Sequence, residues 1–250
     1  MRFKDKVVVI TGGNSGIGKA AAIQFAKEGA KVMIADLSEK MGDDLVEEIE
    51  KSGGEASFIR VNVTDFDDVE RMFEQTLLRM GKVDVIVNSA GVLGPRMRTE
   101  KYPMEAFDKV IDVNVKGLWY CMQVALKHFM EKKSGNIVNI ASVAGHVGMS
   151  GHIAYCASKH AVMGMTKTTG IEFAKHGIRV NAVCPGFTVT PMLEGSEVDD
   201  AYLEALQNAT PMKRFGKPEE ISTAILYLAS DESSYMTGQC MILDGGLISQ

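Results

Sequence analysis

The sequence predicts an α/β protein built on a doubly wound, seven-stranded parallel sheet with helices on both faces. Three observations predict this fold. Short apolar runs recur along the 250-residue chain, stretches with helical periodicity separate them, and a glycine-rich turn follows the first run. The runs are continuously apolar instead of alternating, as expected for parallel strands that helices cover on both sides. Strands that alternate with helices favour right-handed βαβ crossovers.

Each element follows from a local pattern. The predicted strands are short runs rich in β-branched residues, namely Val7–Ile10, Val32–Ala35, Ser57–Val61, Val85–Val87, Ile137–Ile140, Arg179–Val183 and Cys240–Leu243. The predicted helices carry apolar residues at helical spacing and are Gly18–Glu28, Glu39–Lys51, Asp67–Met80, Met104–Lys132, Tyr155–Lys175 and Pro218–Ser230. Asp65, Pro103 and Pro218 stand where helices begin, and Gly29 and Gly177 stand where helices end.

The chain is predicted to form a single domain over residues 1–250, because it contains no Pro- or Ser-rich linker and no repeat. One segment, about residues 187–218, breaks the alternation of strands and helices. It holds three prolines, two glycines and a short amphipathic piece around Asp199–Gln207. A long insertion near the end of an α/β chain is typical of a substrate loop. The alternative is a plain surface excursion.

Composition excludes several classes of protein. The 27 basic and 32 acidic residues give a net charge of −5 without a basic run, so nucleic acid is not an expected partner. No apolar stretch approaches the roughly 18–20 residues that cross a bilayer, so no membrane partner is expected. The first residues do not resemble a signal peptide, which favours a cytoplasmic protein. The four cysteines are scattered, so neither a metal site nor a disulfide framework is expected.

A glycine-rich turn, Thr11–Gly18, lies between the first predicted strand and the first predicted helix. Glycines allow positive φ and let the backbone approach a pyrophosphate, while a helix N-terminus offers free N–H groups. No lysine follows in the manner of a P-loop, so ATP and GTP fit poorly. The turn therefore predicts a dinucleotide site formed by Gly12, Asn14, Ser15, Gly16, Ile17 and Gly18.

Asp36 ends the second predicted strand, where a carboxylate is expected to accept hydrogen bonds from the adenosine ribose. Asp36 would repel a 2′-phosphate, and neither Ser15 nor Leu37 offers a compensating cation. NAD is therefore the predicted cofactor, rather than NADP. The alternative is that Asp36 only caps the following helix.

Tyr155 and Lys159 are spaced i, i+4, so both project from one face of a helix. A free tyrosine is a poor base at neutral pH. A nearby ammonium, together with the charge of an oxidised nicotinamide, favours the phenolate and lowers the pKa of the phenol. Ser142 ends a buried strand earlier in the chain and would place its hydroxyl beside the phenol. An isolated pair of this kind is more often an exposed Lys over an apolar Tyr.

The motifs occur in a specific order: Thr11-Gly12 with Gly16 and Gly18, Asn88-Ser89-Ala90-Gly91, Asn114, Ser142, Tyr155 with Lys159, Pro185-Gly186 and Asp244-Gly245-Gly246. From about Lys6 to Gly246 the chain resembles the short-chain dehydrogenase/reductase family, in its single-domain branch of about 250 residues. The resemblance implies a Rossmann fold. Three positions depart from the family pattern, namely Ser89, Asn62 and Ala141.

The resemblance also implies a role for each matched residue. Tyr155 would be the general acid/base, Ser142 would orient the substrate oxygen, and Lys159 would bind the nicotinamide ribose and lower the pKa of the phenol. Asn114 would hold a water in a proton relay through Lys159. Further cofactor contacts would come from Asn62, Val63, Asn88, Ala90, Gly91, Pro185, Gly186, Thr188 and Thr190.

The sequence is interpreted as an NAD-dependent oxidoreductase that interconverts a secondary alcohol and a ketone. The alternatives are an NADP-linked reductase of 3-oxoacyl thioesters and a non-catalytic dinucleotide sensor. By resemblance, a homotetramer is expected, and Trp119 is predicted at a surface or a subunit contact.

Several residues near the predicted site have two readings. His146 and His152 either recognise a polar substituent or are loop histidines, and Met149 and Met192 either line an apolar pocket or fill the core. Arg96 is predicted to be a solvated surface residue rather than a substrate contact.

Overall fold

The computed structural model describes residues 1–194 and 200–250. In this part of the chain, seven strands form one parallel sheet in the order β3-β2-β1-β4-β5-β6-β7. The order reverses between β1 and β4, which is the doubly wound arrangement that the sequence predicts. The strands are β1 (Val7–Thr11), β2 (Lys31–Asp36), β3 (Glu55–Arg60), β4 (Val85–Asn88), β5 (Gly135–Ile140), β6 (Ile178–Pro185) and β7 (Cys240–Leu243).

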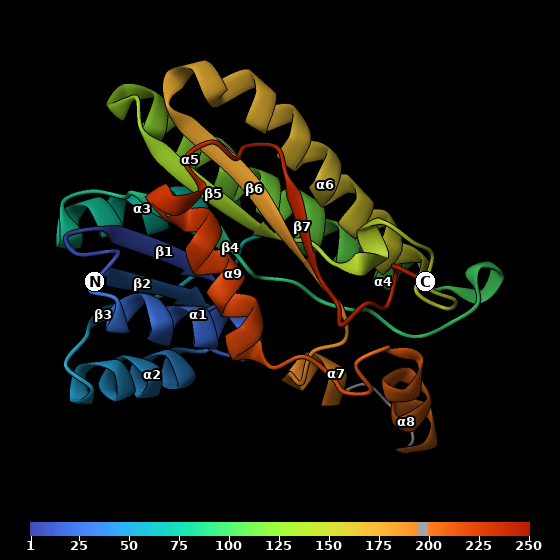
Figure 1. Cartoon of the computed structure of the whole chain (residues 1–250). Coiled ribbons are helices and arrows are strands. Elements are labelled where there is room, and N and C mark those ends of the chain that lie inside the picture. Colours follow the sequence, from blue (N-terminus) through green and yellow to red (C-terminus); the bar gives the residue numbers. More distant parts are fainter. Residues whose placement is uncertain (195–199) are drawn as a thin grey trace.

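Helices cover both faces of the sheet, as predicted (Figure 1). They are α1 (Gly16–Lys27), α2 (Glu39–Lys51), α3 (Phe66–Met80), α4 (Met104–Ile111), α5 (Leu118–Lys132), α6 (Ile153–Phe173), α7 (Pro191–Glu194), α8 (Asp200–Ala209) and α9 (Pro218–Ala229). Successive residues of β1 enter different cores. Val8 packs with α1, α2 and α9, whereas Val9 packs with α3, α5 and α6. Both faces of the strand are therefore buried, which explains its continuously apolar sequence.

The predicted helix Met104–Lys132 is divided into three parts. A π-helical turn, Asp112–Gly117, lies between α4 and α5. The extra residue of a π-turn widens the helix locally, and such turns are frequent at functional sites. Hydrophobic periodicity does not detect an insertion of one residue, so the sequence reads as one continuous helix. Asn114, one of the predicted site residues, lies on this turn.

The segment 187–218 leaves the sheet after β6 and carries α7 and α8. Its two ends are joined by hydrogen bonds from Val189 N to Gly216 O (3.0 Å) and from Gly216 N to Phe187 O (2.9 Å). Residues 200–207 of the predicted amphipathic piece belong to α8, while Asp199 lies outside the described residues. α7 and α8 lie beyond the carboxyl ends of the strands (Figure 1).

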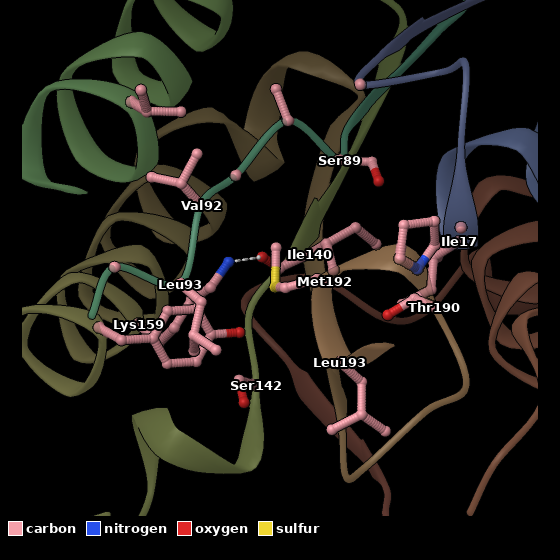
Figure 2. A pocket seen from close by; sticks show the side chains of 18 of the residues that line it. Ile17, Ser89, Val92, Leu93, Ile140, Ser142, Lys159, Thr190, Met192 and Leu193 are labelled. Atoms are coloured by element: carbon pink, nitrogen blue, oxygen red, sulfur yellow. Dashed lines mark hydrogen bonds between the residues drawn. The ribbon is translucent and has the colours of Figure 1, made fainter. Parts of the chain in front are cut away.

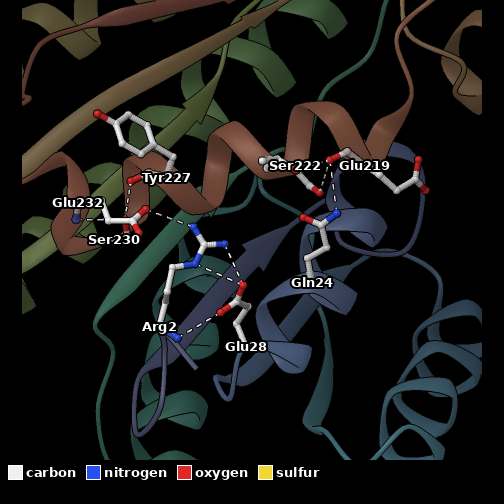
Figure 3. A network of polar contacts seen from close by, with 9 residues as sticks. Arg2, Gln24, Glu28, Glu219, Ser222, Tyr227, Ser230 and Glu232 are labelled. Carbon is white, nitrogen blue, oxygen red and sulfur yellow. Dashed lines mark hydrogen bonds and ion pairs between the residues drawn. The ribbon is translucent and has the colours of Figure 1, made fainter.

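A polar network joins the N-terminus to α1 and to the region after α9 (Figure 3). The Arg2 guanidinium pairs with Glu28 (2.9 Å) and Glu232 (3.4 Å), and Gln24 Nε2 donates to the Glu219 carbonyl (3.4 Å). Solvent-exposed pairs of this kind each contribute only about 0–1 kcal/mol. The network therefore fixes the chain end more than it stabilises the fold.

Candidate functional site

A cavity of about 900 Å³ opens at the carboxyl ends of the strands. Its lining comes from the segments that follow β1, β2, β4, β5 and β6, together with residues of α6 and α8 (Figure 2). Doubly wound sheets bind ligands at this edge, next to the point where the strand order reverses. The volume lies within the range of small-molecule sites, which is roughly 300–1,000 Å³.

The glycine-rich turn forms one end of the cavity, which we call the cofactor end. Gly12 and Gly16 have positive φ values of 64° and 51°. A Cβ on Gly12 would lie 2.7 Å from the Ala90 backbone, and a Cβ on Gly18 would overlap the Gly12 carbonyl oxygen. Glycine is therefore required for the turn to fit between the segment after β4 and the start of α1. Gly12, Ser15, Gly16 and Ile17 line the cavity.

Asn14 and Gly18 also belong to the predicted cofactor set, but they build the turn instead of lining the cavity. Asn14 is buried, and its Nδ2 donates to the Ser38 carbonyl (2.8 Å). This bond ties the turn to the start of α2. Asn14 and Gly18 therefore stabilise the conformation of the glycine-rich turn without lining the cavity themselves.

Asp36 lies at the end of β2 and lines the cavity. Its carboxylate accepts the backbone N–H groups of Asn14 (3.0 Å) and Leu37 (2.7 Å). The first turn of α2 begins after Ser38, and within the described residues the Asp36 carboxylate accepts hydrogen bonds from Asn14 and Leu37 but none from that turn. The alternative in which Asp36 only caps that helix is therefore wrong. Two backbone donors instead fix a negative charge at the cofactor end.

Asn62 and Val63 line the cavity beside Asp36, as expected. The Asn62 side-chain oxygen accepts hydrogen bonds from Thr64 N (3.1 Å) and Thr64 Oγ1 (2.9 Å). A carbonyl oxygen has two lone pairs, and both have donors here. An adenine amine would have to share or displace one of these bonds.

The segment after β4 walls the cavity through Ser89, Ala90 and Gly91, but not through Asn88. Asn88 is 2% exposed, and its Nδ2 donates to Asn139 Oδ1 (2.9 Å) in the neighbouring strand. The Asn88 side chain therefore does not line the cavity, and a contact between Asn88 and the cofactor stays a prediction. As the last residue of β4, its side chain points into the layer between the sheet and α6, where Asn139 continues to Thr166 (2.9 Å).

Tyr155, Lys159 and Ser142 all line the same cavity. Tyr155 and Lys159 come from α6, and Ser142 follows β5, so the predicted triad is brought together. Lys159 Nζ donates to the Ile140 carbonyl (2.8 Å) and lies 5.5 Å from the centre of the Tyr155 ring. Ser142 Oγ accepts the Ala144 N–H (3.1 Å). Figure 2 shows the Lys159 side chain directed at Ile140, with Ser142 nearby.

Burial controls the ionisation of this group. It raises the pKa of Tyr155 to about 12, against a smaller lowering by the hydrogen bond with Ser142. Burial also lowers the pKa of Lys159 to about 8. The sequence predicted a lowered pKa for the phenol, and that prediction is not met by the protein groups alone. The Lys159 ammonium is engaged with Ile140, so an additional positive charge would be needed to stabilise the phenolate.

Asn114 is clamped behind the cavity. It is 1% exposed, its Oδ1 accepts Val92 N (2.8 Å), and its Nδ2 donates to Val92 O (2.9 Å) and Ser158 Oγ (3.0 Å). Its side chain therefore joins the segment after β4 to α6. These three bonds use both Nδ2 hydrogens and one of the two lone pairs of Oδ1, so one acceptor position is left for a water.

Pro185, Gly186, Thr188 and Thr190 line the cavity after β6, as expected. A Cβ on Gly186 would lie 2.8 Å from Asp244, so only glycine fits between β6 and the Asp244-Gly245-Gly246 motif.

The opposite end of the cavity, which we call the substrate end, was predicted in part: Met149 and Met192 line the cavity, as in the apolar-pocket interpretation, and so do residues of the segment 187–218. It is lined by Leu93, Arg96, Met149, His152, Phe187, Met192, Leu193, Tyr202 and Leu206, with other residues. Arg96 is exposed as predicted, but it lines the cavity, and its guanidinium lies 4.1 Å from the centre of the Tyr202 ring. The predicted exposure of Arg96 is therefore confirmed, whereas its place in the cavity wall was not predicted. His146 is exposed and absent from the lining, in agreement with a loop histidine.

His152 is a substrate-end residue with a sequence signal of its own. It precedes Tyr155 by three positions at the start of α6, and side chains with this spacing are neighbours. Arg96 and Tyr202 are separated by about a hundred residues, so no local pattern joins them.

Within residues 1–194 and 200–250, no three His, Cys, Asp or Glu side chains gather in a group that could hold a metal ion. The four cysteines are free thiols. Across the same described ranges, no helix is long and apolar enough to cross a membrane.

Comparisons with known proteins agree with this site. A family model described as enoyl-(acyl carrier protein) reductase matches residues 12–248. The chain is 44% identical over 248 residues to the 3-oxoacyl-(acyl-carrier-protein) reductase FabG of Thermotoga maritima, a match that covers 99% of this chain and 100% of that protein.

Two solved structures share the fold. Levodione reductase has a TM-score of 0.95 and 36% identity, with 98% of each chain covered. The actinorhodin polyketide ketoreductase with NADPH has a TM-score of 0.93 and 33% identity, with 97% of each chain covered. With the glycine-rich turn and the Ser142, Tyr155 and Lys159 group in one cavity, these matches show that the chain belongs to the short-chain dehydrogenase/reductase family of oxidoreductases.

Proposed function

We propose that this protein is an NAD-dependent oxidoreductase that interconverts a secondary alcohol and a ketone. The single observation that carries the proposal is the shared cavity. It combines an acid/base group formed by Tyr155, Lys159 and Ser142 with a glycine turn and a fixed carboxylate, Asp36. A site that only senses a dinucleotide does not need the acid/base group. The substrate is a small molecule that enters from the substrate end.

The cofactor end fits a nicotinamide dinucleotide. The turn from Gly12 to Ile17 offers backbone N–H groups and the N-terminus of α1 to a pyrophosphate. The Asp36 carboxylate is aligned to accept ribose hydroxyls, and the residues that hold it, Asn14 and Leu37, are uncharged. Among the described residues that line the cofactor end beside Asp36, none is a Lys or an Arg, so a 2′-phosphate at this point would meet only the negative charge of Asp36, which favours NAD.

The bound cofactor supplies the hydride that is exchanged with the reacting carbon. In the direction of reduction, the buried Tyr155 phenol donates its proton to the substrate oxygen. The Ser142 hydroxyl donates a hydrogen bond to the same oxygen and holds it near the phenol. In the direction of oxidation, Tyr155 accepts the alcohol proton as the phenolate. The raised pKa of Tyr155 keeps the acid form available at neutral pH.

Lys159 has two proposed roles. Its ammonium contacts the nicotinamide ribose and favours the Tyr155 phenolate once the cofactor charge is also present. Its lowered pKa, about 8, makes it able to pass a proton toward solvent. Both amide hydrogens of Asn114 are used, but its Oδ1 accepts one bond and keeps a second lone pair for a water of the proposed relay. Asn114 also borders the wall at Gly91, where a Cβ would lie 3.3 Å from Asn114 Oδ1 and 3.8 Å from Lys159 Nζ.

The segment 187–218 is proposed to cover the substrate, because Phe187, Met192 and Tyr202 line the cavity from it. Covering the site would exclude water from the reacting atoms. A homotetramer is also proposed. Apolar side chains on α5 and α6 remain exposed in the monomer, with Trp119 at 48% and Ile171 at 79%. Analytical ultracentrifugation would give the mass of the assembly.

The second candidate function is an NADP-linked reductase of 3-oxoacyl thioesters. The 44% identity to FabG of Thermotoga maritima and the similarity to a ketoreductase solved with NADPH favour it. The similarity to levodione reductase, which by its name acts on a dione, favours the first candidate instead. Both reactions would use the same Tyr155, Lys159 and Ser142, so the cofactor and the substrate distinguish them.

A coupled assay tests the choice. The purified protein is supplied with NAD or NADP and a panel of secondary alcohols, and with NADH or NADPH and a panel of cyclic ketones and a 3-oxoacyl thioester. The proposal expects turnover of alcohols and ketones with NAD and NADH. Efficient turnover of the thioester with NADPH alone would establish the second candidate.

A further inference from the structure

His152 is a buried polar side chain at the substrate end that no contact within the fold explains. It is 7% exposed and lines the cavity. It occupies the N-cap position of α6, but its side chain makes no capping hydrogen bond. Its Nδ1 is closed off and has no hydrogen-bond partner in the described part of the chain. Buried polar groups normally have partners. Among the described residues the fold ties this ring down with no side-chain cap bond and no bond to Nδ1, so the ring stands in the cavity wall without a structural role, and its other nitrogen, Nε2, is left for a ligand.

The charge state of the ring limits the ligand. Burial lowers the pKa of His152, and the positive charge of Arg96 lowers it further. The imidazole is therefore neutral at pH 7 and presents one N–H donor and one acceptor. Nδ1 is closed off, and His152 lines the cavity, so we assign the contact with a molecule in the cavity to Nε2. Among the described residues that line the cavity, Asp36 is the sole acidic one, and it lies at the cofactor end.

The remaining walls of the substrate end are mainly apolar. Leu93, Val143, Met149, Phe187 and Met192 line the same cavity as His152. Such walls bind the hydrocarbon part of a substrate, and a single polar group among them fixes its orientation. Arg96 is exposed, and its guanidinium is stacked on the Tyr202 ring, whose centre lies 4.1 Å away.

Distance along α6 relates His152 to the reaction centre. His152 and Tyr155 are three residues apart, and side chains with this spacing have Cβ atoms roughly 5–6 Å apart. A substrate whose oxygen contacts Tyr155 therefore brings atoms a few bonds away next to His152.

We propose that His152 hydrogen-bonds a second oxygen of the substrate, a hydroxyl or carbonyl two to four carbons from the reacting carbon. The preferred substrates are thus hydroxy ketones, diketones or diols instead of monofunctional alcohols. This inference rests on the proposed function and adds a specificity-determining residue to it. A hydroxyl suits either tautomer of the ring, because it both donates and accepts.

The test compares two substrates that differ by one oxygen. The kcat/KM values for cyclohexanol and cyclohexane-1,3-diol are measured with NAD for the wild type, His152→Leu, His152→Gln and His146→Leu. The wild type should prefer the diol by about tenfold or more, and His152→Leu should lose about tenfold of that preference. His152→Gln, which keeps a side-chain donor and acceptor, should retain much of it. His146→Leu, the matched control on the exposed loop, should leave both values unchanged.

The outcomes separate this inference from the proposed function. A wild type that oxidises neither substrate, nor any other alcohol of the panel, overturns the proposed function and this inference with it. A wild type that oxidises both substrates but does not prefer the diol overturns the inference and leaves the proposed function standing. This result is obtained with the wild-type protein, so it does not depend on the folding of any variant. An unchanged preference in a folded His152→Leu variant, with a normal thermal unfolding curve, also overturns it.

Discussion

The cofactor end and the substrate end of the cavity are built in different ways. At the cofactor end, backbone groups set the geometry. Gly12 and Gly16 adopt positive φ, and two backbone N–H groups hold the Asp36 carboxylate. At the substrate end, side chains from distant segments set the geometry. An example is the Arg96 guanidinium, which stacks on the Tyr202 ring.

This difference separates the properties of the site that any nicotinamide dinucleotide requires from those that depend on the substrate of this protein. A backbone cradle recognises phosphates and ribose, which every nicotinamide dinucleotide carries. Long or flexible side chains such as Arg96, Met149 and Met192 adapt to the shape of one substrate. Substitutions at the cofactor end should therefore change which cofactor is used, whereas substitutions at the substrate end should change which alcohol is used.

The largest effect is expected between the two ends, at the acid/base group. Tyr155→Phe removes the proton donor and keeps the ring, so turnover should fall by about 10²–10⁴-fold. The affinity for NADH, measured by fluorescence titration, should stay nearly unchanged because the cofactor end is intact. If the variant retains turnover, Tyr155 is not the acid/base group.

At the cofactor end, Asp36→Asn removes the charge that repels a 2′-phosphate. The ratio of kcat/KM for NADPH to that for NADH should rise about tenfold to hundredfold, since like charges at this range cost roughly 1–3 kcal/mol. Asp43→Asn makes the same change in net charge on the exposed face of α2 and serves as the control. A ratio that moves equally in both variants would assign the effect to overall charge.

The pH dependence tests the ionisation of Tyr155. A raised pKa means that the phenol keeps its proton to higher pH, so the acid required for ketone reduction is present at neutral pH. Alcohol oxidation requires the phenolate, whose fraction rises tenfold per pH unit below the pKa, so its kcat/KM should rise by up to about a hundredfold from pH 7 to 9. Ketone reduction should not rise over the same range. Profiles of the same direction for both reactions would contradict the assignment.

The smallest effect is expected at the substrate end. Tyr202→Leu removes the ring under the Arg96 guanidinium, a contact worth about 0.5–1 kcal/mol at an exposed site. The KM for the alcohol should rise roughly two- to fivefold, while the KM for NAD stays constant. A change in the KM for NAD instead would show that the two ends are not independent.

Sequence reasoning predicted the two ends unequally. The strands, the glycine turn and Asp36 follow from patterns within a few residues, because a strand–turn–helix unit is local. The position of Asn88 was not predictable in this way. Its type and its place at the end of β4 fit a cofactor contact, but its side chain turns toward Asn139 on the neighbouring strand.

The substrate end was less predictable, since it depends on contacts between distant segments. The sequence around Arg96 indicates only an exposed loop residue. In the structure, Tyr202 of α8 packs against the Arg96 guanidinium, and both side chains line the cavity. The π-helical turn at Asp112–Gly117 was missed because one inserted residue leaves the apolar pattern readable as a single helix.

The most direct test of the central claim is the ratio of kcat/KM for NADH to that for NADPH, measured on the wild-type protein with a cyclic ketone as substrate. The fixed Asp36 carboxylate predicts a preference for NADH of at least about tenfold. A clear preference for NADPH would contradict the claim and make the thioester reductase the better assignment.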